Sequence, residues 1–453
     1  MNIVPVTPGF AAQIMGGRYI GPKGLLDTCI TSHVLDNREA VSGSMFYCIR
    51  GEKHDGHRFA SAALDAGAVC CVAEQPLDRE PYILVPSVQK ALQELAAWYR
   101  DHVGIPVVAV VGSVGKTTAK EMVAAVLSER FCVHKTPKNL NSQLGVPLTV
   151  LGIQREHEAA VIEIGISEFG QMDTLGHVVR PDITVFTSVA SCHLEFLCNL
   201  DGVLRAKSEI FPHTADWLVL SGDDERLSSL FPREHTVHFG ISDTCDYRAE
   251  KIENLGFDGI RFEIRTPIGQ IPGTVYSYGG HLPFAAAGAA AVGSILGMTP
   301  GEISRGFARF APSEGRANVL KAGRITVIDD CYNASPVAVR QALHSLCALP
   351  GRRIAILGDM KELGHSSPEL HREVGELSAA LPLKLICCGQ EAKEIYSGAA
   401  ASGADTAWYP DLDSLLKAIP DYVCPGDLIL VKASHSMSFG RVVEALCALG
   451  ESL

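Results

Sequence analysis

Short apolar runs recur along the chain and alternate with longer segments of helical spacing. Between residues 107 and 222 four of these runs are almost uninterrupted: VVAVVG, AAVIEIG, DITVFTSV and DWLVLSG. Continuous runs rich in β-branched residues are typical of strands that are buried on both faces of a parallel sheet. The alternation therefore predicts βαβ units and a doubly wound, mostly parallel sheet.

The pattern differs on both sides of this segment. Up to about residue 103 the runs SMFYCIRG, AGAVCCVAE and PYILVP predict short strands, and ALQELAAWYRDHV has helical spacing. Apolar residues at 260, 262 and 264 alternate with polar ones and predict a half-exposed antiparallel strand, and residues 284–296 predict a packed helix. Four further runs predict a Rossmann-like unit: RITVIDD, RIAILGD, LKLICCG and DLILVKAS.

We therefore predict an α/β protein with three domains, divided at Gly104 and near Pro312. The length of 453 residues agrees with this number, since one domain takes roughly 150 residues. The prediction is a smaller mixed α/β domain over residues 1–103, a central domain with a P-loop-type sheet over 104–311, and a C-terminal Rossmann-like domain over 312–453.

Composition narrows the class of protein. A hydrophobic content of 47% and a net charge of −12 predict a globular protein that does not bind nucleic acid. The N-terminus lacks the features of a signal peptide, and no apolar stretch reaches the ~20 residues of a membrane span. The chain has fourteen cysteines, and four of them form two adjacent pairs, at 70–71 and 387–388. Both pairs lie inside apolar runs, which indicates buried thiols. We expect a cytoplasmic protein without membrane insertion.

The sharpest chemical signal is the segment VVAVVGSVGKTTAKEM. Gly112, Gly115, Lys116 and Thr117 follow a predicted buried strand and open a predicted helix, the setting in which a glycine-rich loop binds polyphosphate. Val110 stands where the longer G-x-x-x-x-G-K-[ST] pattern has its first glycine, so the motif is the shorter G-x-x-G-K-T. Taken alone, the segment also fits a helix start with an unrelated lysine.

Three polar residues extend this signal. Glu163 ends a predicted parallel strand, where a carboxylate suits a hard cation, although a capping or ion-paired glutamate fits equally well. His193 follows another strand end, and an isolated histidine is more often a satisfied polar residue than a ligand. Lys207 lies on a predicted helix and by default is a solvated surface lysine.

Together with further motifs, these residues resemble the Mur ligases, the ATP-dependent amide-forming enzymes of peptidoglycan precursor synthesis. The resemblance covers nearly the whole chain and rests on GSVGKTTAKEM, NLNSQLGVPLTVL, EIG at Glu163, HLE at His193, AKSEI at Lys207, Gly315-Arg316, DDCYNASP, and ILGDMKELG followed by His371. It implies a monomeric, ADP-forming ligase that joins D-Ala-D-Ala to UDP-N-acetylmuramoyl-tripeptide through an acyl-phosphate.

The resemblance also implies roles for individual residues. The catalytic set is Lys116, Glu163, His193 and Lys207. Two Mg²⁺ ions would be held by Thr117, Glu163, His193 and Lys207, the last carbamylated to an anion. ATP would be bound by Gly112, Ser113, Gly115, Lys116, Thr117, Thr118, Arg316 and Asp330. The UDP-sugar peptide would be bound by Asp36, Arg38, Ser44, Phe46, Asn139 and Asn141.

Several positions depart from the family pattern. Leu282 and Ala285 stand where many members have amides near adenine, and Ser335 replaces the second Asn of Y-N-A-N. The other departures are Asn37, Ala433 and His435. Two alternatives stay open at this point: another Mur-type or folylpolyglutamate-type ligase, and a catalytically silent homologue that binds nucleotide.

Overall fold

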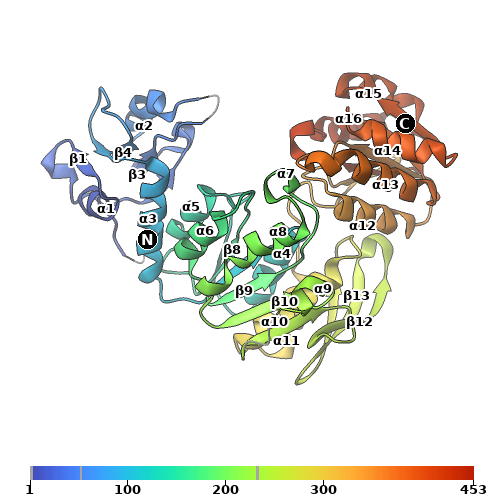
Figure 1. The fold of residues 1–453 in the computed structure, drawn as a ribbon, viewed down its shortest axis with the longest axis horizontal. Helices are drawn as coiled ribbons and strands as arrows, with labels where there is room; N and C mark the ends of the chain where they lie inside the picture. Colours follow the sequence, from blue (N-terminus) through green and yellow to red (C-terminus); the bar gives the residue numbers. More distant parts are fainter. Residues whose placement is uncertain (1–3, 52–53, 231–233) are drawn as a thin grey trace. The chain divides into compact units, whose positions relative to one another are not determined.

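The computed structural model describes residues 4–51, 54–230 and 234–453. It holds three β-sheets with helices packed against them, which confirms the predicted α/β class (Figure 1). By its internal packing the chain forms two compact units. The first unit comprises the residues up to Val111 together with 130–185 and 207–218, and the second comprises 112–129, 186–206 and 219–453. The predicted domain boundaries stay a prediction.

The first sheet is small and mixed, as predicted for the N-terminal segment. Its strands are ordered β1 (Arg18–Ile20), β5 (Tyr82–Leu84), β4 (Cys70–Ala73), β3 (Ser44–Tyr47) and β2 (Ser32–Val34). Only the β1–β5 pair is antiparallel. The helices of this segment are α1 (Pro8–Ile14), α2 (Ala60–Asp65) and α3 (Val88–Asp101). Every residue of β3 and β4 is buried, so these strands form the core of the sheet.

The second sheet has nine strands, and β9 and β10 begin in the first unit and end in the second. The strand order is β14 (Gly269–Val275), β13 (Ile260–Thr266), β12 (Tyr247–Asn254), β11 (Thr236–Gly240), β10 (Trp217–Ser221), β9 (Ile183–Phe186), β6 (Val107–Val111), β8 (Ala159–Glu163) and β7 (Val133–Lys135). The pairs β6–β8 and β7–β8 are parallel, and β12, β13 and β14 pair antiparallel. In β13 the predicted alternation is confirmed, because Ile260, Phe262 and Ile264 are buried.

Helices connect and cover these strands. They are α4 (Lys116–Leu127), α5 (Gly145–Leu151), α6 (Gln171–Val179), α7 (Leu194–Leu197), α8 (Leu200–Ser208), α9 (Glu225–Ser228), α10 (Leu282–Ile295) and α11 (Pro300–Ala308). Helix α10 is the packed helix predicted over 284–296, and it begins two residues earlier because Pro283 is accommodated in its first turn. Its small side chains allow close packing against α4, with eleven of its residues buried.

The third sheet has the predicted Rossmann-like organisation. Its order is β15 (Asn318–Ala322), β16 (Ile325–Asp329), β20 (Leu428–Lys432), β17 (Arg353–Gly358), β18 (Lys384–Cys388) and β19 (Thr406–Tyr409), and only the β15–β16 hairpin is antiparallel. Its helices are α12 (Pro336–Cys347), α13 (Ser367–Ala379), α14 (Ala392–Ala401), α15 (Leu412–Ala418) and α16 (Gly440–Ser452). Successive residues of a strand point to opposite faces of this sheet, and each face has its own hydrophobic core. Leu357 and Cys387 belong to one core, and Ile356 and Cys388 belong to the other.

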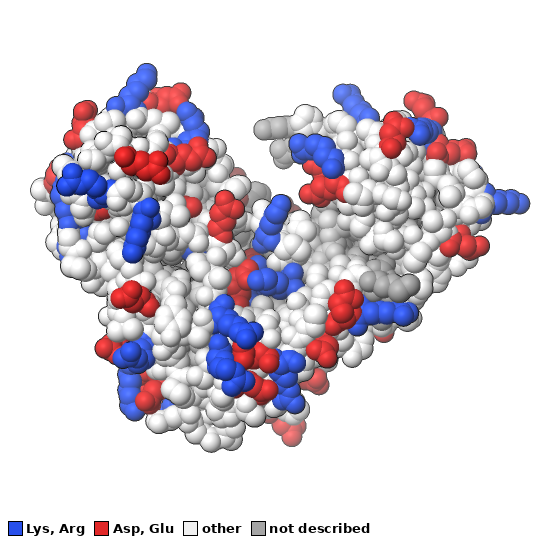
Figure 2. All heavy atoms as spheres, turned by 180° about the vertical axis from the view of Figure 1, so that it is seen from behind, with Lys and Arg blue, Asp and Glu red and all other residues white. Residues whose placement is uncertain are grey.

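The adjacent cysteine pairs at 70–71 and 387–388 are buried, as expected from the apolar runs in which they lie. All fourteen cysteines lie within the described residues, and all are free thiols. On the face drawn in Figure 2, Lys and Arg side chains lie among Asp and Glu side chains. None of the helices in the described residues combines the length and the apolar character that a membrane span needs.

A buried arginine ties α3 to the start of the second sheet within the first unit. Arg100 is 9% exposed, and its guanidinium donates to the carbonyls of Val179 (2.8 Å) and Val103 (2.9 Å) and to Asp182 Oδ2 (3.0 Å). The same carboxylate oxygen accepts the amide of Val107, the first residue of β6, at 2.7 Å. The Arg100–Asp182 pair therefore satisfies backbone atoms on three segments.

We predict that Arg100→Ala lowers the free energy of the first urea unfolding transition by about 2–4 kcal/mol, because it leaves Asp182 without its positive partner and the carbonyls of Val103, Val179 and Arg180 without the guanidinium donor. The exposed Arg58→Ala, from the same unit, is the matched control. Equal midpoints for the two variants, followed by circular dichroism, would contradict this role of Arg100.

Candidate active site

The turn between β6 and α4 has a backbone that only glycine fits. Gly112 has φ +141° and Gly115 has φ +85°, and α4 begins at Lys116. A Cβ atom on Gly112 would lie 2.1 Å from Thr187 Oγ1. The amide of Ser113 donates to Ser188 O (2.9 Å), which holds the turn against the segment after β9. Free amides at the start of a helix, on a turn of this kind, form a site for an anion such as a phosphate.

Lys116 lies over this turn. Its Nζ donates to Gly112 O (2.9 Å) and Ser113 O (3.3 Å), so the ammonium group is held at the mouth of the predicted phosphate site. Ser113 Oγ accepts the amide of Ala190 at 3.0 Å, which fixes the loop from its other side. The structure thus brings together the glycines, Lys116 and the first hydroxyls of α4, as the motif predicted.

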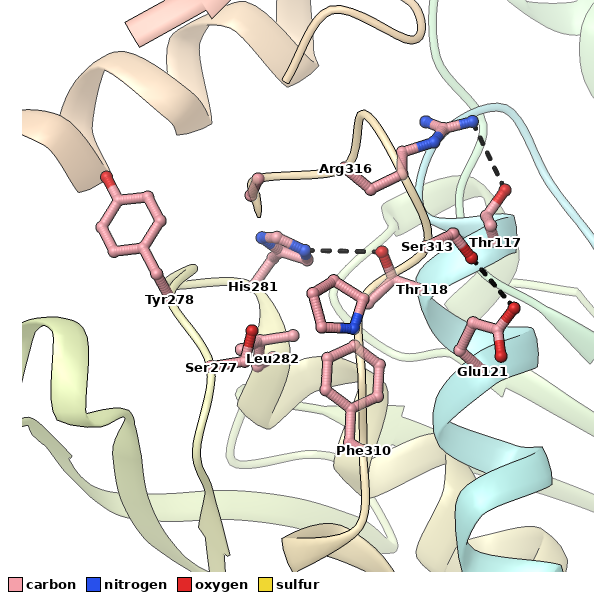
Figure 3. A pocket seen from close by; sticks show the side chains of 12 residues that line it. Thr117, Thr118, Glu121, Ser277, Tyr278, His281, Leu282, Phe310, Ser313 and Arg316 are labelled. Atoms are coloured by element: carbon pink, nitrogen blue, oxygen red, sulfur yellow. Dashed lines mark hydrogen bonds between the residues drawn. The ribbon is translucent and has the colours of Figure 1, made fainter. Parts of the chain in front are cut away.

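Arg316 reaches the same place from the segment that leads into the third sheet. Its Nη2 donates to Thr117 Oγ1 at 3.4 Å (Figure 3). Its guanidinium carbon lies 4.1 Å from the centroid of the Tyr332 ring. Stacking on an aromatic ring holds a guanidinium in place without neutralising it. Arg316 therefore presents a fixed positive charge next to the loop.

Two further contacts join α4 to the segment before α10 and to the segment after α11. Thr118 Oγ1 and His281 Nε2 are 3.5 Å apart, and Ser313 Oγ donates to Glu121 at 2.9 Å (Figure 3). Burial lowers the pKa of His281, so its imidazole is neutral at pH 7. The first turns of α4 are thereby held by residues that come from two distant parts of the sequence.

A cavity of about 570 Å³ extends from the loop to α12 within the second unit. The loop contributes Gly115, Thr117 and Thr118, and the third sheet contributes Asp330 and Lys432. Lys432 Nζ donates to Asp330 Oδ2 at 2.6 Å, so that the Asp330 carboxylate is held beside a counter-charge at the cavity wall. The volume lies in the range of small-molecule and cofactor sites.

In the first unit, Glu163 is the last residue of β8 and is 2% exposed. Its Oε1 accepts from Asn141 Nδ2 at 2.8 Å, and its amide donates to Thr136 Oγ1 at 2.8 Å. The amide of Asn141 in turn donates to Asn139 O at 2.7 Å. The predicted substrate residue Asn141 therefore orients the carboxylate of Glu163, a contact that its sequence motif did not indicate; substrate binding by Asn139 and Asn141 stays a prediction.

Lys207 is completely buried at the end of α8. The default interpretation of Lys207 as a solvated surface lysine is wrong, because the helix turns this side chain into the protein. A completely buried lysine is a candidate for a functional group rather than for a solubilising one.

His193, in the second unit, has a partner that the sequence analysis did not single out. Its Nδ1 lies 2.6 Å from Oε2 of Glu362, inside the ILGDMKELG segment. The close approach of the His193 imidazole lowers the pKa of Glu362, which keeps that carboxyl group ionised at neutral pH. Spacing in the sequence offered no signal for this contact.

The predicted UDP residues lie in and beside the first sheet. Asp36 caps a 3₁₀ turn and accepts from Arg38 Nε at 2.9 Å, and hydrogen bonds from Arg38 lower the pKa of Asp36 to about 2. Ser44 is fully buried and its Oγ accepts the amide of Val41 (2.9 Å), while Phe46 is 1% exposed within the core. UDP binding by these four residues stays a prediction.

The described residues contain no cluster of three or more His, Cys, Asp or Glu side chains that could hold a metal ion. Among the predicted ligands, the Thr117 hydroxyl and the Glu163 carboxylate supply oxygen atoms, the donors that Mg²⁺ takes. An unmodified Lys207 does not fit a cation, whereas a carbamate on its Nζ has the required charge and oxygen atoms.

Comparison with known proteins assigns all three sheets to one family. Residues 30–111 match the Mur ligase family catalytic domain, 110–292 the Mur ligase middle domain, and 315–435 the Mur ligase glutamate ligase domain. UDP-N-acetylmuramoyl-tripeptide–D-alanyl-D-alanine ligase of Synechocystis is 33% identical over 93% of both chains, and that of Escherichia coli is 32% identical over 98% of this chain and 99% of its own.

Solved structures agree with this assignment. MurF from Acinetobacter baumannii superposes with a TM-score of 0.89 at 29% identity, covering 99% of this chain and 100% of its own. MurF ligase from Thermotoga maritima in complex with ADP has a TM-score of 0.82 at 30% identity, covering 93% and 98%. Folylpolyglutamate synthase from Mycobacterium tuberculosis, at 13% identity and a TM-score of 0.61, shares the fold.

We predict that Gly112→Ala weakens ADP binding, measured by calorimetry, about tenfold or more, because a shift of the turn away from Thr187 costs about 1–3 kcal/mol. Gly104→Ala is the control, since a Cβ there meets nothing within 4 Å. Wild-type affinity in Gly112→Ala would remove this turn from the nucleotide site.

Proposed function

The chain belongs to the Mur ligase family, and on this premise we propose that it is the ATP-dependent ligase that joins D-Ala-D-Ala to UDP-N-acetylmuramoyl-tripeptide, in peptidoglycan precursor synthesis. The observation that carries the proposal is the full-length identity of 32–33% to ligases of this name. The glycine turn, Lys116 and Arg316, which lie together in the second unit, support the ATP-dependent part of the reaction.

The chemistry explains why positive charge gathers at this turn. A free carboxylate is a poor electrophile, and transfer of the γ-phosphoryl group of ATP converts it into an acyl-phosphate. The amine of the dipeptide then attacks the carbonyl carbon, the tetrahedral intermediate loses phosphate, and an amide forms. The first step brings together several anionic groups, so positioning and charge neutralisation supply most of the catalysis.

The residues of this chain divide that task. We infer that Lys116 and Arg316 stabilise negative charge on the transferred phosphoryl group, and that Asp330, beside Lys432, binds the ribose. Two Mg²⁺ ions, when bound, supply further positive charge; Thr117, Glu163, His193 and Lys207 would hold them. Asn141 orients the Glu163 carboxylate for this role.

Lys207 fits this scheme in its carbamylated form. Addition of CO₂ to the neutral amine forms an N–C bond and releases a proton, so that a cationic side chain becomes an anion. The complete burial of Lys207 supports a place inside the site. From the family likeness we also propose a monomeric protein in the cytoplasm.

The two alternatives are less well supported. One ligase of another name, UDP-N-acetylmuramoyl-L-alanyl-D-glutamate–2,6-diaminopimelate ligase, shares the fold with a TM-score of 0.54 at 16% identity. A silent homologue was considered because of Leu282, Ala285 and Ser335. The first two are buried in α10, and Ser335 is the N-cap of α12, accepting the amide of Ala338. These three residues thus have structural roles, and the residues proposed to bind phosphate match the family motif.

The function is tested by phosphate release across a matrix of substrates. We expect turnover with ATP, UDP-N-acetylmuramoyl-tripeptide and D-Ala-D-Ala, and none when folate and glutamate replace the last two. Turnover with folate would assign the chain to the folylpolyglutamate-type ligases. The absence of turnover in every combination would support the silent homologue.

We predict that Lys207→Ala loses nearly all ligase activity and that a short carboxylic acid such as acetate restores part of it, by occupying the place of the carbamate. Phosphate release with increasing acetate measures the rescue. Lys116→Ala is the matched control, since it removes a different charge and acetate should not restore it. Full activity of Lys207→Ala without acetate would refute a carbamate at this position.

A further inference from the structure

Arg316 ends a turn that begins at Ser313, within the second unit. The amide of Arg316 donates to Ser313 O at 3.2 Å and to Asn318 Oδ1 at 3.1 Å. Gly315 has φ +68°, in the left-handed region that favours glycine, and its carbonyl accepts the amide of Tyr332 at 3.1 Å. The backbone of the turn is thus defined, and the place of the Arg316 guanidinium depends on where the turn is attached.

Helix α4 holds this turn at both of its ends (Figure 3). Ser313 Oγ donates to Glu121 Oε1 at 2.9 Å, and Arg316 Nη2 donates to Thr117 Oγ1 at 3.4 Å. Residues four apart lie on the same face of a helix, so Thr117 and Glu121 contact the turn from one face of α4. A short hydrogen bond to a carboxylate is stronger than a long one to a hydroxyl. The contact between Ser313 and Glu121 is therefore the firmer of the two attachments.

Glu121 is itself held in place. Its side chain is 11% exposed, and its Oε1 lies 3.0 Å from Nζ of Lys120, which is 1% exposed. A carboxylate away from water needs a counter-charge, and the buried ammonium group supplies it. Glu121 lies in the second turn of α4, beyond the residues to which the proposed function gives a phosphate group. Neither Lys120 nor Glu121 has a part in that function so far.

We propose that Glu121 is a positioning residue for Arg316: through Ser313 it attaches the turn to α4 and holds the guanidinium beside the phosphate loop. The inference rests on the proposed function, which gives Arg316 a phosphoryl group to stabilise. A displacement of about 1 Å at a reacting group can lower a rate by roughly 100-fold, so an anchor that never touches the substrate still affects the reaction. Because α4 also begins at the loop, one helix sets the distance between the loop and Arg316.

The attachment is measured by hydrogen–deuterium exchange of the protein without nucleotide. Ser313→Ala removes the donor and leaves Lys120 next to Glu121. In this variant we expect the amides of residues 314–317 to exchange about tenfold faster or more, because a hydrogen bond to a charged group is lost. Ser313→Thr keeps the hydroxyl and should retain the wild-type rate. Ser397→Ala, which removes a hydroxyl that donates within α14, is the matched control and should also retain it.

Kinetics provide the second readout. We expect Ser313→Ala to lower kcat of the ligase reaction about tenfold or more, with an unchanged KM for D-Ala-D-Ala, because a displaced guanidinium stabilises the transferred phosphoryl group less well. Glu121→Gln, whose amide oxygen still accepts from Ser313, should lie between the wild type and Ser313→Ala. In protein that already carries Arg316→Ala, the change at Ser313 should lower kcat by no more than about twofold, since its effect passes through Arg316.

The possible failures are distinguishable. Wild-type exchange over residues 314–317 in Ser313→Ala would overturn the positioning role of Glu121, whatever the activity of the variant. An equal loss of kcat from Ser313→Ala with and without Arg316 would also overturn it, because the effect would then not pass through the guanidinium. Wild-type activity in Arg316→Ala would instead refute the role that the proposed function gives Arg316. Circular dichroism of each variant confirms that the fold is retained.

Discussion

The close approach of Gly112 to Thr187 is the constraint on which the candidate site depends. A side chain at residue 112 would overlap the Thr187 hydroxyl, and the left-handed backbone of Gly115 completes the same turn. Because the turn is held in this way, α4 begins at Lys116. The position of Lys116, the first hydroxyls of α4 and the contact with Arg316 all follow from where that helix begins.

Neighbouring polar and aromatic side chains hold the candidate site residues in place. Asn141 binds Glu163, Lys432 binds Asp330, and Tyr332 stacks on Arg316. A ligase of this kind has to gather many negative charges, and a mobile side chain would lose rotamer freedom each time it did so. Side chains that are already held by neighbours avoid this loss, which is the physical advantage of a preorganised site.

The departures from the family pattern are consistent with this arrangement. Ala285 lies in α10, whose small residues allow close packing against α4, the helix that begins at the phosphate loop. Ser335 supplies the oxygen that caps α12, a helix that lines the large cavity. At these positions the chain has replaced polar groups by packing and capping, while the charged residues around the loop are present.

The sequence by itself determined the local structure and the family. Continuous apolar runs marked the buried strands, and the alternation at Ile260, Phe262 and Ile264 marked an antiparallel strand. The G-x-x-G-K-T motif marked the glycine turn and the start of α4, because each of these features depends on residues that are close along the chain. Only the tertiary structure decided the burial of Lys207 and the pairing of His193 with Glu362. The pairing joins segments that are far apart in sequence. Periodicity indicates the conformation of one segment, whereas the packing of whole elements determines which side chains become neighbours.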